Sequence, residues 1–364
     1  MVESKSNKFL NIAVAMFLVG FSFYILKELQ FILLPFFIAL IVSFIFEPFY
    51  EWMRRKKIPS AVAIIIVILV ILIIANISSI FILTSVNSFT TQIPKYTEKS
   101  TIIINSFWNN LNTWGFFNEH IKNSLDISKI INAETIANLA TNFFTGIAGL
   151  FANFVLIMIY VIFLLTEFGS IRKRLLKAFS TEKSRVIADT ATDIFTDIKK
   201  YILGKTLINL LHGLIITFIL WIFGVDFFIV WGFLAFLMAY IPNIGTMIST
   251  ILPFSTSLIQ FDGDLTKPLI ILILMVVAGN VIGNIVEPKV LGDKLNISPI
   301  VLLVSLIFWG YLWGIVGMIL SVPIMSMIKI ILGKFEQTRS IAILMSYDTS
   351  EFKTKDSGRP AEMS

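Results

Sequence analysis

The polar residues best suited to chemistry lie within an apolar stretch near the C-terminal end of the chain. Asn280, Asn284 and Glu287 follow one another at intervals of four and three, which predicts that they share one face of a helix. Such a face could coordinate a cation, bind a hydroxyl-rich solute or relay a proton, because polar groups inside a membrane usually face a cavity or another helix. The structural alternative is that the Asn pair joins two helices and that Glu287 pairs with Lys289 or Lys294.

A second group surrounds the sequence Pro242-Asn243-Ile244-Gly245, in the middle of another apolar stretch. Pro and Gly interrupt a helix and free backbone amides and carbonyls for a ligand. Thr246 adds a hydroxyl directly after the break. The alternative to a binding site here is a tight turn whose hydroxyl groups cap a helix.

Asn209 and His212 lie one helical turn apart in the apolar segment before that break. An intramembrane His can titrate near neutral pH, or it can be a neutral, hydrogen-bonded packing residue. Gly204-Lys205-Thr206 completes no phosphate-binding loop, because position 199 holds Lys where that motif requires Gly. The chain has two His, no Cys and no G-x-S-x-G nucleophile elbow. We therefore expect neither an enzyme nor a bound metal or cofactor.

Composition indicates which kind of scaffold positions these residues. The 364 residues are 57% hydrophobic and 14% charged, with a mean hydropathy of +0.87, whereas soluble domains are about 25% charged. The chain is therefore predicted to be an all-α polytopic membrane protein, with the lipid bilayer as its main partner. Its net charge of +6 lies in loops, where it indicates orientation rather than binding to nucleic acid.

Eight hydrophobic segments are expected, and two of them are too long to cross a bilayer once. The stretch from 226 to 261 would measure about 50 Å as a straight helix at ~1.5 Å per residue, against a hydrocarbon core of about 30 Å. Its break is Pro242–Gly245, and a similar stretch breaks at the sequence WGYLWG, residues 309–314. The eight segments cover residues 9–26, 31–46, 61–83, 143–165, 207–223, 227–259, 269–286 and 300–332.

Segments five to eight form two similar units, each of one span followed by a broken stretch. Tyr240 and Gly245 in the first unit correspond to Tyr311 and Gly317 in the second. If both broken stretches are re-entrant hairpins, the units have inverted topology and the basic residues after segment seven are cytoplasmic. If both stretches cross instead, those basic residues lie outside. We favour the hairpins because they satisfy the tendency of Lys and Arg to remain inside.

The basic residues also predict the organisation of the whole chain, with both termini in the cytoplasm. The expected regions are segments one to three (1–84), an external amphipathic helical cap (85–142), segment four with a cytoplasmic helical linker (143–205), the transport core (206–332) and a polar cytoplasmic tail (333–364).

Several motifs resemble the autoinducer-2 exporter family of bacterial membrane proteins. They are RRKKIP at 54–59, YIPNIG at 240–245, NIVEPKVLG at 284–292, LNISP at 295–299, WGIVG at 313–317 and Val322-Pro323. The resemblance implies a permease of the bacterial inner membrane that forms a homo-oligomer. Some members of this family are linked to export of a furanone-type quorum-sensing signal, and others are described as sodium/proton antiporters.

From these observations we expect a secondary transporter that exports a small polar solute such as autoinducer-2, with protons or sodium as the coupling ion. A monovalent cation/proton antiporter is the first alternative, for which Glu287 would supply the titrating carboxylate. A non-transporting or channel-like membrane assembly protein is the second alternative.

Overall fold

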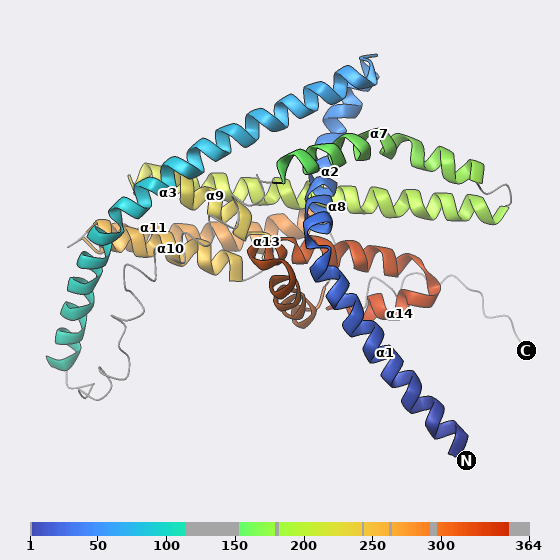
Figure 1. The fold of residues 1–364 in the computed structure, drawn as a ribbon. Helices are drawn as coiled ribbons and strands as arrows, with labels where there is room; N and C mark the ends of the chain where they lie inside the picture. Colours follow the sequence, from blue (N-terminus) through green and yellow to red (C-terminus); the bar gives the residue numbers. More distant parts are fainter. Residues whose placement is uncertain are drawn as a thin grey trace, which may run out of the picture.

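The computed structural model describes residues 2–113, 153–178, 182–241, 244–261, 264–291 and 297–348 (Figure 1). Across these ranges every regular element is a helix. The elements are α1 (Val2–Glu28), α2 (Gln30–Arg55), α3 (Ser60–Thr113), α7 (Phe154–Ala178), α8 (Glu182–Ile222), α9 (Phe228–Met238), α10 (Ile244–Gln260), α11 (Thr266–Val281), the π-helix η1 (Ile282–Val286), α12 (Glu287–Leu291), α13 (Pro299–Lys334) and α14 (Glu336–Leu344).

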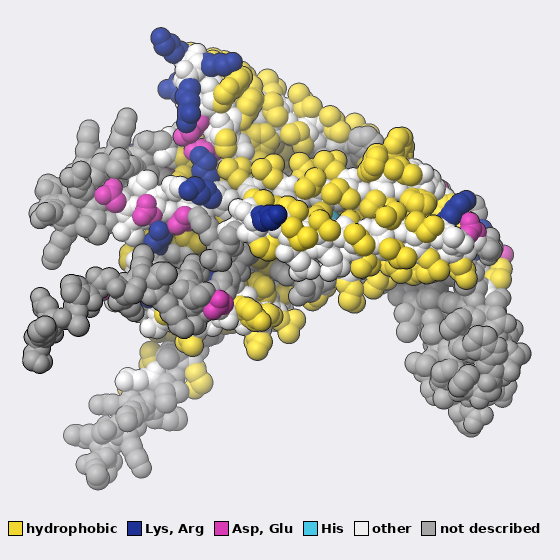
Figure 2. Space-filling model, turned by 180° about the vertical axis from the view of Figure 1, so that it is seen from behind, with side chains coloured by type: hydrophobic (Ala, Val, Ile, Leu, Met, Phe, Trp, Pro, Cys, Tyr) yellow, Lys and Arg dark blue, Asp and Glu magenta, His cyan; other side chains and the backbone are white. Residues whose placement is uncertain are grey.

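Five helices in the described ranges are long and apolar enough to cross a membrane. They are Gln30–Arg55, Ser60–Ile80, Asp189–Ile222, Thr266–Leu291 and Pro299–Lys334, and Phe154–Phe168 and Phe228–Met238 are shorter apolar helices. Figure 2 shows hydrophobic side chains spread over the middle of the visible face, with many Lys and Arg side chains gathered toward one side. The all-helical fold is thus confirmed for the described residues and is consistent with a membrane protein, whereas the number of crossings stays a prediction.

Two helices run through boundaries that the sequence pattern predicts. α8 is continuous across residues 205 and 206, where the predicted linker meets the transport core. Gly204 does not interrupt it, and a Cβ there would lie 2.6 Å from Leu291 Cδ2, so this glycine allows α12 to pack closely. α3 likewise continues past residue 85 to Thr113. Residues 114–142 of the predicted cap lie outside the described residues.

The first broken stretch folds back on itself, with α9 and α10 as its two arms. At its inner end a Cβ on Gly245 would lie 1.7 Å from the Met238 carbonyl oxygen, so only glycine permits this approach. At its open end the Asp226 N–H donates to Gln260 Oε1 (2.8 Å), and Gln260 Nε2 donates to the Gly224 carbonyl (2.8 Å). We call α9 and α10 the first hairpin.

The second broken stretch also folds back on itself, within α13. Gly314 has φ 64° and ψ −148°, a conformation that favours glycine. Beyond it, a Cβ on Gly317 would lie 2.0 Å from the Trp309 carbonyl oxygen, and Ser305 Oγ lies 3.4 Å from the Ser321 carbonyl. The two halves of α13 are therefore antiparallel, and we call them the second hairpin. Re-entry of either hairpin into a membrane stays a prediction.

The two hairpins share details that support an internal repeat. In each, a glycine of the second arm packs on a carbonyl of the first arm. In each, a buried serine four residues after that glycine donates to the carbonyl three residues before the serine: Ser249 to Thr246 (3.1 Å) and Ser321 to Met318 (2.6 Å). The same backbone contact thus recurs after each break.

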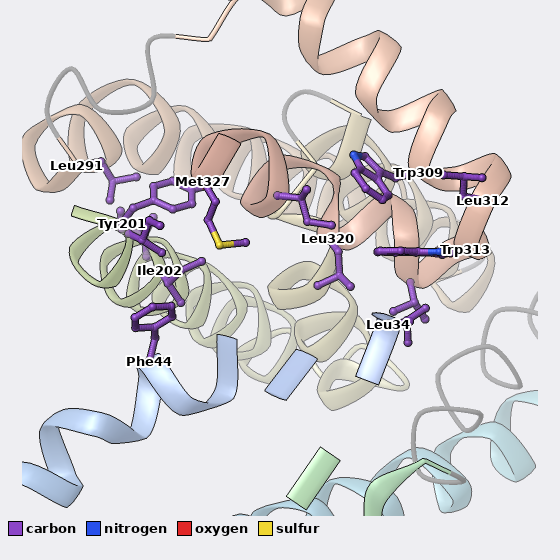
Figure 3. Packing of buried hydrophobic residues seen from close by; sticks show 14 of the residues in the cluster. Leu34, Phe44, Tyr201, Ile202, Leu291, Trp309, Leu312, Trp313, Leu320 and Met327 are labelled. Atoms are coloured by element: carbon purple, nitrogen blue, oxygen red, sulfur yellow. The ribbon is translucent and has the colours of Figure 1, made fainter. Parts of the chain in front are cut away.

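The largest apolar core lies where α2, α8 and α13 meet (Figure 3). Phe44 comes from α2, Tyr201 and Ile202 come from α8, and Trp309 and Met327 come from the two arms of the second hairpin. Because α8 also packs along α9 and against α11 and α12, it is the central helix around which both hairpins are placed.

Candidate functional site

A buried ion pair lies at the centre of the polar groups. Lys205 Nζ of α8 is 2.6 Å from Glu287 Oε1 at the start of α12. The Lys205 side chain is 4% exposed and that of Glu287 is 22% exposed. A buried lysine needs such a partner because desolvation of an unpaired charge is strongly unfavourable. The sequence pattern placed Lys205 among cytoplasmic loop charges and proposed Lys289 or Lys294 as the partner of Glu287.

The next turns of α8 continue the polar surface toward the first hairpin. Asn209 is buried, and with its amide oriented to satisfy both groups it donates to the Lys205 carbonyl (3.2 Å) and accepts from the Tyr240 N–H (3.3 Å). Thr206 Oγ1 and the Tyr240 hydroxyl share a hydrogen bond of 2.8 Å. His212 is buried as well and faces the backbone of Ala235 in α9. The predicted pair Asn209 and His212 thus borders the first hairpin directly.

Asn280 and Asn284 do not join this cluster. η1 begins at Ile282, and its wider turn shifts the register between the two amides and Glu287. Asn284 Nδ2 donates to Asn280 Oδ1 (3.1 Å), Asn280 Nδ2 donates to the Val276 carbonyl (2.8 Å), and both side chains are exposed. The predicted single face is therefore divided: the amides face outward and Glu287 faces α8.

The structure describes only some of the site residues predicted around the first break. Gly245 is buried at the tip of the first hairpin, and the Thr246 carbonyl accepts the hydrogen bond from Ser249. Pro242 and Asn243 lie outside the described residues. The described part of the break therefore closes the hairpin tip next to Tyr240.

Further ion pairs tie α8 to its neighbours. Lys199 pairs with Glu47 of α2, and Lys334 of α13 lies 3.2 Å from Asp197. Asp193, Asp197, Tyr201, Lys205 and Asn209 occupy every fourth position of α8, so they form a row that winds gradually around the helix. We call these five residues the α8 polar stripe. That spacing was the one sequence signal that could have identified it.

The charged residues of the stripe form ion pairs between helices. No group of three or more His, Cys, Asp or Glu side chains that could hold a metal ion occurs in the described part of the chain. In the stripe, Asp197 pairs with Lys334 of α13 and Lys205 pairs with Glu287 of α12. Lys199, which lies between them on α8 but outside the stripe, pairs with Glu47 of α2. An ion pair between separate helices can open when the helices move, so this arrangement suits a conformational change.

Comparison with known proteins agrees with a transport role. The family model described as AI-2E family transporter matches residues 12–337. The AI-2 transport protein TqsA of Escherichia coli K12 is 30% identical over 318 residues, covering 86% of this chain and 89% of TqsA.

Two further relatives cover the chain to a similar extent. A Borreliella burgdorferi protein named "Putative transport protein" is 30% identical over 311 residues, covering 85% of this chain and 83% of its own. Bacillus subtilis YrrI is 23% identical over 319 residues, covering 85% of this chain and 88% of its own. With its apolar helices and a family match over most of its length, the chain is a multi-pass membrane protein that belongs to the AI-2E family of transporters.

Proposed function

We propose that this protein is a secondary transporter that exports a small polar solute, with autoinducer-2 as the first solute to test. The name of the relative TqsA supports that choice. In this proposal the protein lies in the bacterial inner membrane with both termini in the cytoplasm. The solute site lies between α8, the tip of the first hairpin and α12.

The Lys205–Glu287 pair is the observation that carries the proposal. While the pair is closed, the two charges neutralise each other and neither is free for a ligand. Protonation of Glu287 removes its negative charge and frees the Lys205 ammonium, which changes what the site attracts. Binding of a proton can thereby be linked to opening of the α8–α12 contact.

The surrounding polar groups suit a hydroxyl-rich solute. Asn209, His212, Thr206 and Tyr240 offer amide, imidazole and hydroxyl groups on adjoining turns of α8 and the first hairpin. Movement of the hairpin against α8 would exchange their mutual hydrogen bonds for bonds to solute. Gly245 and Thr246 form one wall of the site in this proposal.

The test is flux of labelled autoinducer-2 in proteoliposomes with imposed proton and sodium gradients. Wild type is compared with Glu287→Gln, which keeps the shape of the side chain but removes its charge, and with Glu51→Gln, whose glutamate is exposed on α2. We expect gradient-dependent flux in wild type and Glu51→Gln, and its loss in Glu287→Gln. Normal flux in a well-folded Glu287→Gln protein would contradict the coupling role.

The same vesicles distinguish the alternative functions. Sodium-dependent proton movement without autoinducer-2 flux would support a monovalent cation/proton antiporter instead. In that case sodium would have to displace the Lys205 ammonium from Glu287, so Lys205→Met should strengthen sodium binding. Absence of any saturable flux would favour a non-transporting assembly protein.

A further inference from the structure

The turn between α2 and α3 carries consecutive cations that the proposed transport site does not use. All of them are exposed: Arg54, Arg55, Lys56 and Lys57. Glu51 pairs with Arg55 (3.4 Å), so an excess of positive charge remains. Figure 2 shows Lys and Arg side chains at the upper edge of the molecule, where Figure 1 places this turn. We call the four cations and the adjacent Trp52 the α2–α3 corner.

Hydrogen bonds hold the backbone of the corner in a defined shape. The Ile58 N–H donates to the Met53 carbonyl (3.2 Å), and the Lys57 N–H donates to the Arg54 carbonyl (3.0 Å). These two bonds form a Schellman motif, in which Lys57 follows the last helical turn. Arg54 Nη1 also donates to the Ile58 carbonyl (2.7 Å). The cations therefore project from a fixed turn.

Lys57 occupies the one position of this motif that normally requires glycine. Its φ is 63°, in the left-handed region, where the Cβ of any other residue is crowded by the backbone. Glycine would adopt this conformation without that strain. Strained positions that are retained point to a role for the side chain. We therefore looked for a ligand that the Lys57 ammonium could bind.

The surface next to the corner is apolar and faces outward. Lys56 Nζ lies 4.0 Å from the centre of the Trp52 ring, and Trp52 is half exposed, as is typical of tryptophans at the level of lipid headgroups. Directly after the turn, exposed apolar side chains recur at intervals of three and four along α3, which places them on one face: Val62, Ile65 and Leu69.

A ligand for this surface needs a negative charge joined to hydrocarbon. A soluble anion would match only the cations, whereas an anionic phospholipid matches both parts. We propose that the α2–α3 corner binds the headgroup of a phospholipid with a net negative charge, and that its acyl chains lie along Val62, Ile65 and Leu69. Each cation near an anionic lipid surface contributes about fivefold to such binding. The inference does not depend on which solute the protein carries.

The sequence contains no Cys, so a single fluorescent label can report contact with lipid. The label is attached to Ala61→Cys, an exposed position in the first turn of α3, and the full-length protein is reconstituted into liposomes of phosphatidylcholine and phosphatidylglycerol. Two preparations have the same composition and differ only in which lipid carries bromine, a contact quencher. We expect at least twofold stronger quenching when phosphatidylglycerol carries the bromine.

A label at Ile80→Cys is the matched control. Ile80 is also exposed on α3 but lies about 28 Å from Ala61 along the helix, at ~1.5 Å per residue. Both brominated lipids should quench this label equally.

Lys57→Gly separates lipid binding from folding. It removes one cation, so the amount of brominated phosphatidylglycerol that gives half-maximal quenching at Ala61→Cys should rise about fivefold. The unfolding temperature should be equal to or above that of wild type, because glycine suits the backbone of this turn. Lys267→Gln, which removes an exposed cation from α11, should leave the half-maximal amount unchanged.

Three outcomes would overturn the proposal. The first is equal quenching of the Ala61→Cys label by the two brominated lipids. The second is a half-maximal amount that Lys57→Gly leaves unchanged or that Lys267→Gln raises equally, which would mean that only the overall charge of the protein matters. The third is loss of the quenching on addition of inorganic phosphate at constant ionic strength, which would assign the corner to a soluble anion.

Discussion

Lys205 and Glu287 are 82 positions apart in the sequence, yet their charged atoms lie 2.6 Å apart. The pair joins the middle of α8 to the start of α12, directly after the π-helical turn of η1. Adjacent to it, Asn209 and Thr206 of α8 meet Tyr240 of the first hairpin. One turn of α8 therefore contacts both α12 and the first hairpin, the two elements that move against α8 in the proposed mechanism.

Removal of one partner of this pair should destabilise the protein strongly. Lys205→Ala or Glu287→Ala leaves a buried charge unpaired, so we expect a loss of about 3–5 kcal/mol in the free energy of unfolding. The double variant Lys205→Met with Glu287→Leu should recover most of that loss, because neither charge remains. Thermal unfolding in detergent measures the cycle.

The exposed pair Arg55–Glu51 provides the control for that cycle. Its atoms are 3.4 Å apart and both side chains are exposed. Arg55→Ala should therefore change stability by less than about 1 kcal/mol. A loss from Lys205→Ala no larger than that from Arg55→Ala would show that the buried pair does not stabilise the fold.

The glycines that close the two hairpins should not tolerate a methyl group. Gly245→Ala and Gly317→Ala each place a Cβ within 2.0 Å of a backbone carbonyl oxygen, which forces the arms apart. We expect losses of roughly 1–3 kcal/mol each, typical of overpacking. Gly20→Ala is the control, because its Cβ would have open space around it. Equal unfolding temperatures for all three variants would contradict the close approach.

The contact between Tyr96 of α3 and Asp226 should weaken in alkaline solution. The Tyr96 hydroxyl donates to Asp226 Oδ2 (2.7 Å). Burial of the Tyr96 side chain is the larger cause of its raised pKa, and the neighbouring Asp226 carboxylate is the smaller one. Because the folded pKa lies above the usual value of about 10, the contribution of this contact is complete below pH 10 and declines as pH rises further. Tyr96→Phe should lose about 1.5 kcal/mol at neutral pH.

Unfolding temperatures of wild type and Tyr96→Phe, measured from pH 7 to 11, check this prediction. The difference between them should be constant to about pH 9 and shrink above about pH 10. A difference that grows with pH would contradict the direction of the pKa shift.

The hydrogen bond between Thr206 and Tyr240 should behave as a single interaction between α8 and the first hairpin. Thr206→Val and Tyr240→Phe each remove the 2.8 Å bond, at about 0.5–1.5 kcal/mol. Thr206→Val also removes the bond that Thr206 Oγ1 donates to the Ile202 carbonyl (2.7 Å). The double variant should therefore lose little more than Thr206→Val alone, because the bond to Tyr240 can be removed only once. Fully additive losses in thermal unfolding would show that the two hydroxyls act independently.

The elements of this protein follow largely from local sequence. The run of hydrophobic residues predicts membrane helices because a bilayer requires every backbone group to be hydrogen-bonded within its own segment. The breaks near Gly245 and Gly314 follow from glycine and proline, whose backbone preferences act within a few residues. The boundary predicted between residues 205 and 206 follows only from where charged residues begin, and there α8 continues unbroken.

The sequence predicted only some of the residues of the candidate site. Asn209 and Glu287 were candidates because polar groups are rare in apolar segments, and both belong to the cluster that the structure assembles. Lys205 was missed because a lysine at the end of an apolar run looks the same whether it faces solvent or a carboxylate. The grouping of Asn280 and Asn284 with Glu287 relied on regular helical register, which the π-turn changes.

The sequence by itself therefore determined the class of protein, the positions of the breaks and the polar residues worth testing. Only the tertiary structure decided which of those residues meet. Hydropathy and backbone preference act over a few neighbours along the chain, whereas the partner of Lys205 depends on how α12 packs on α8 after a shift in helical register.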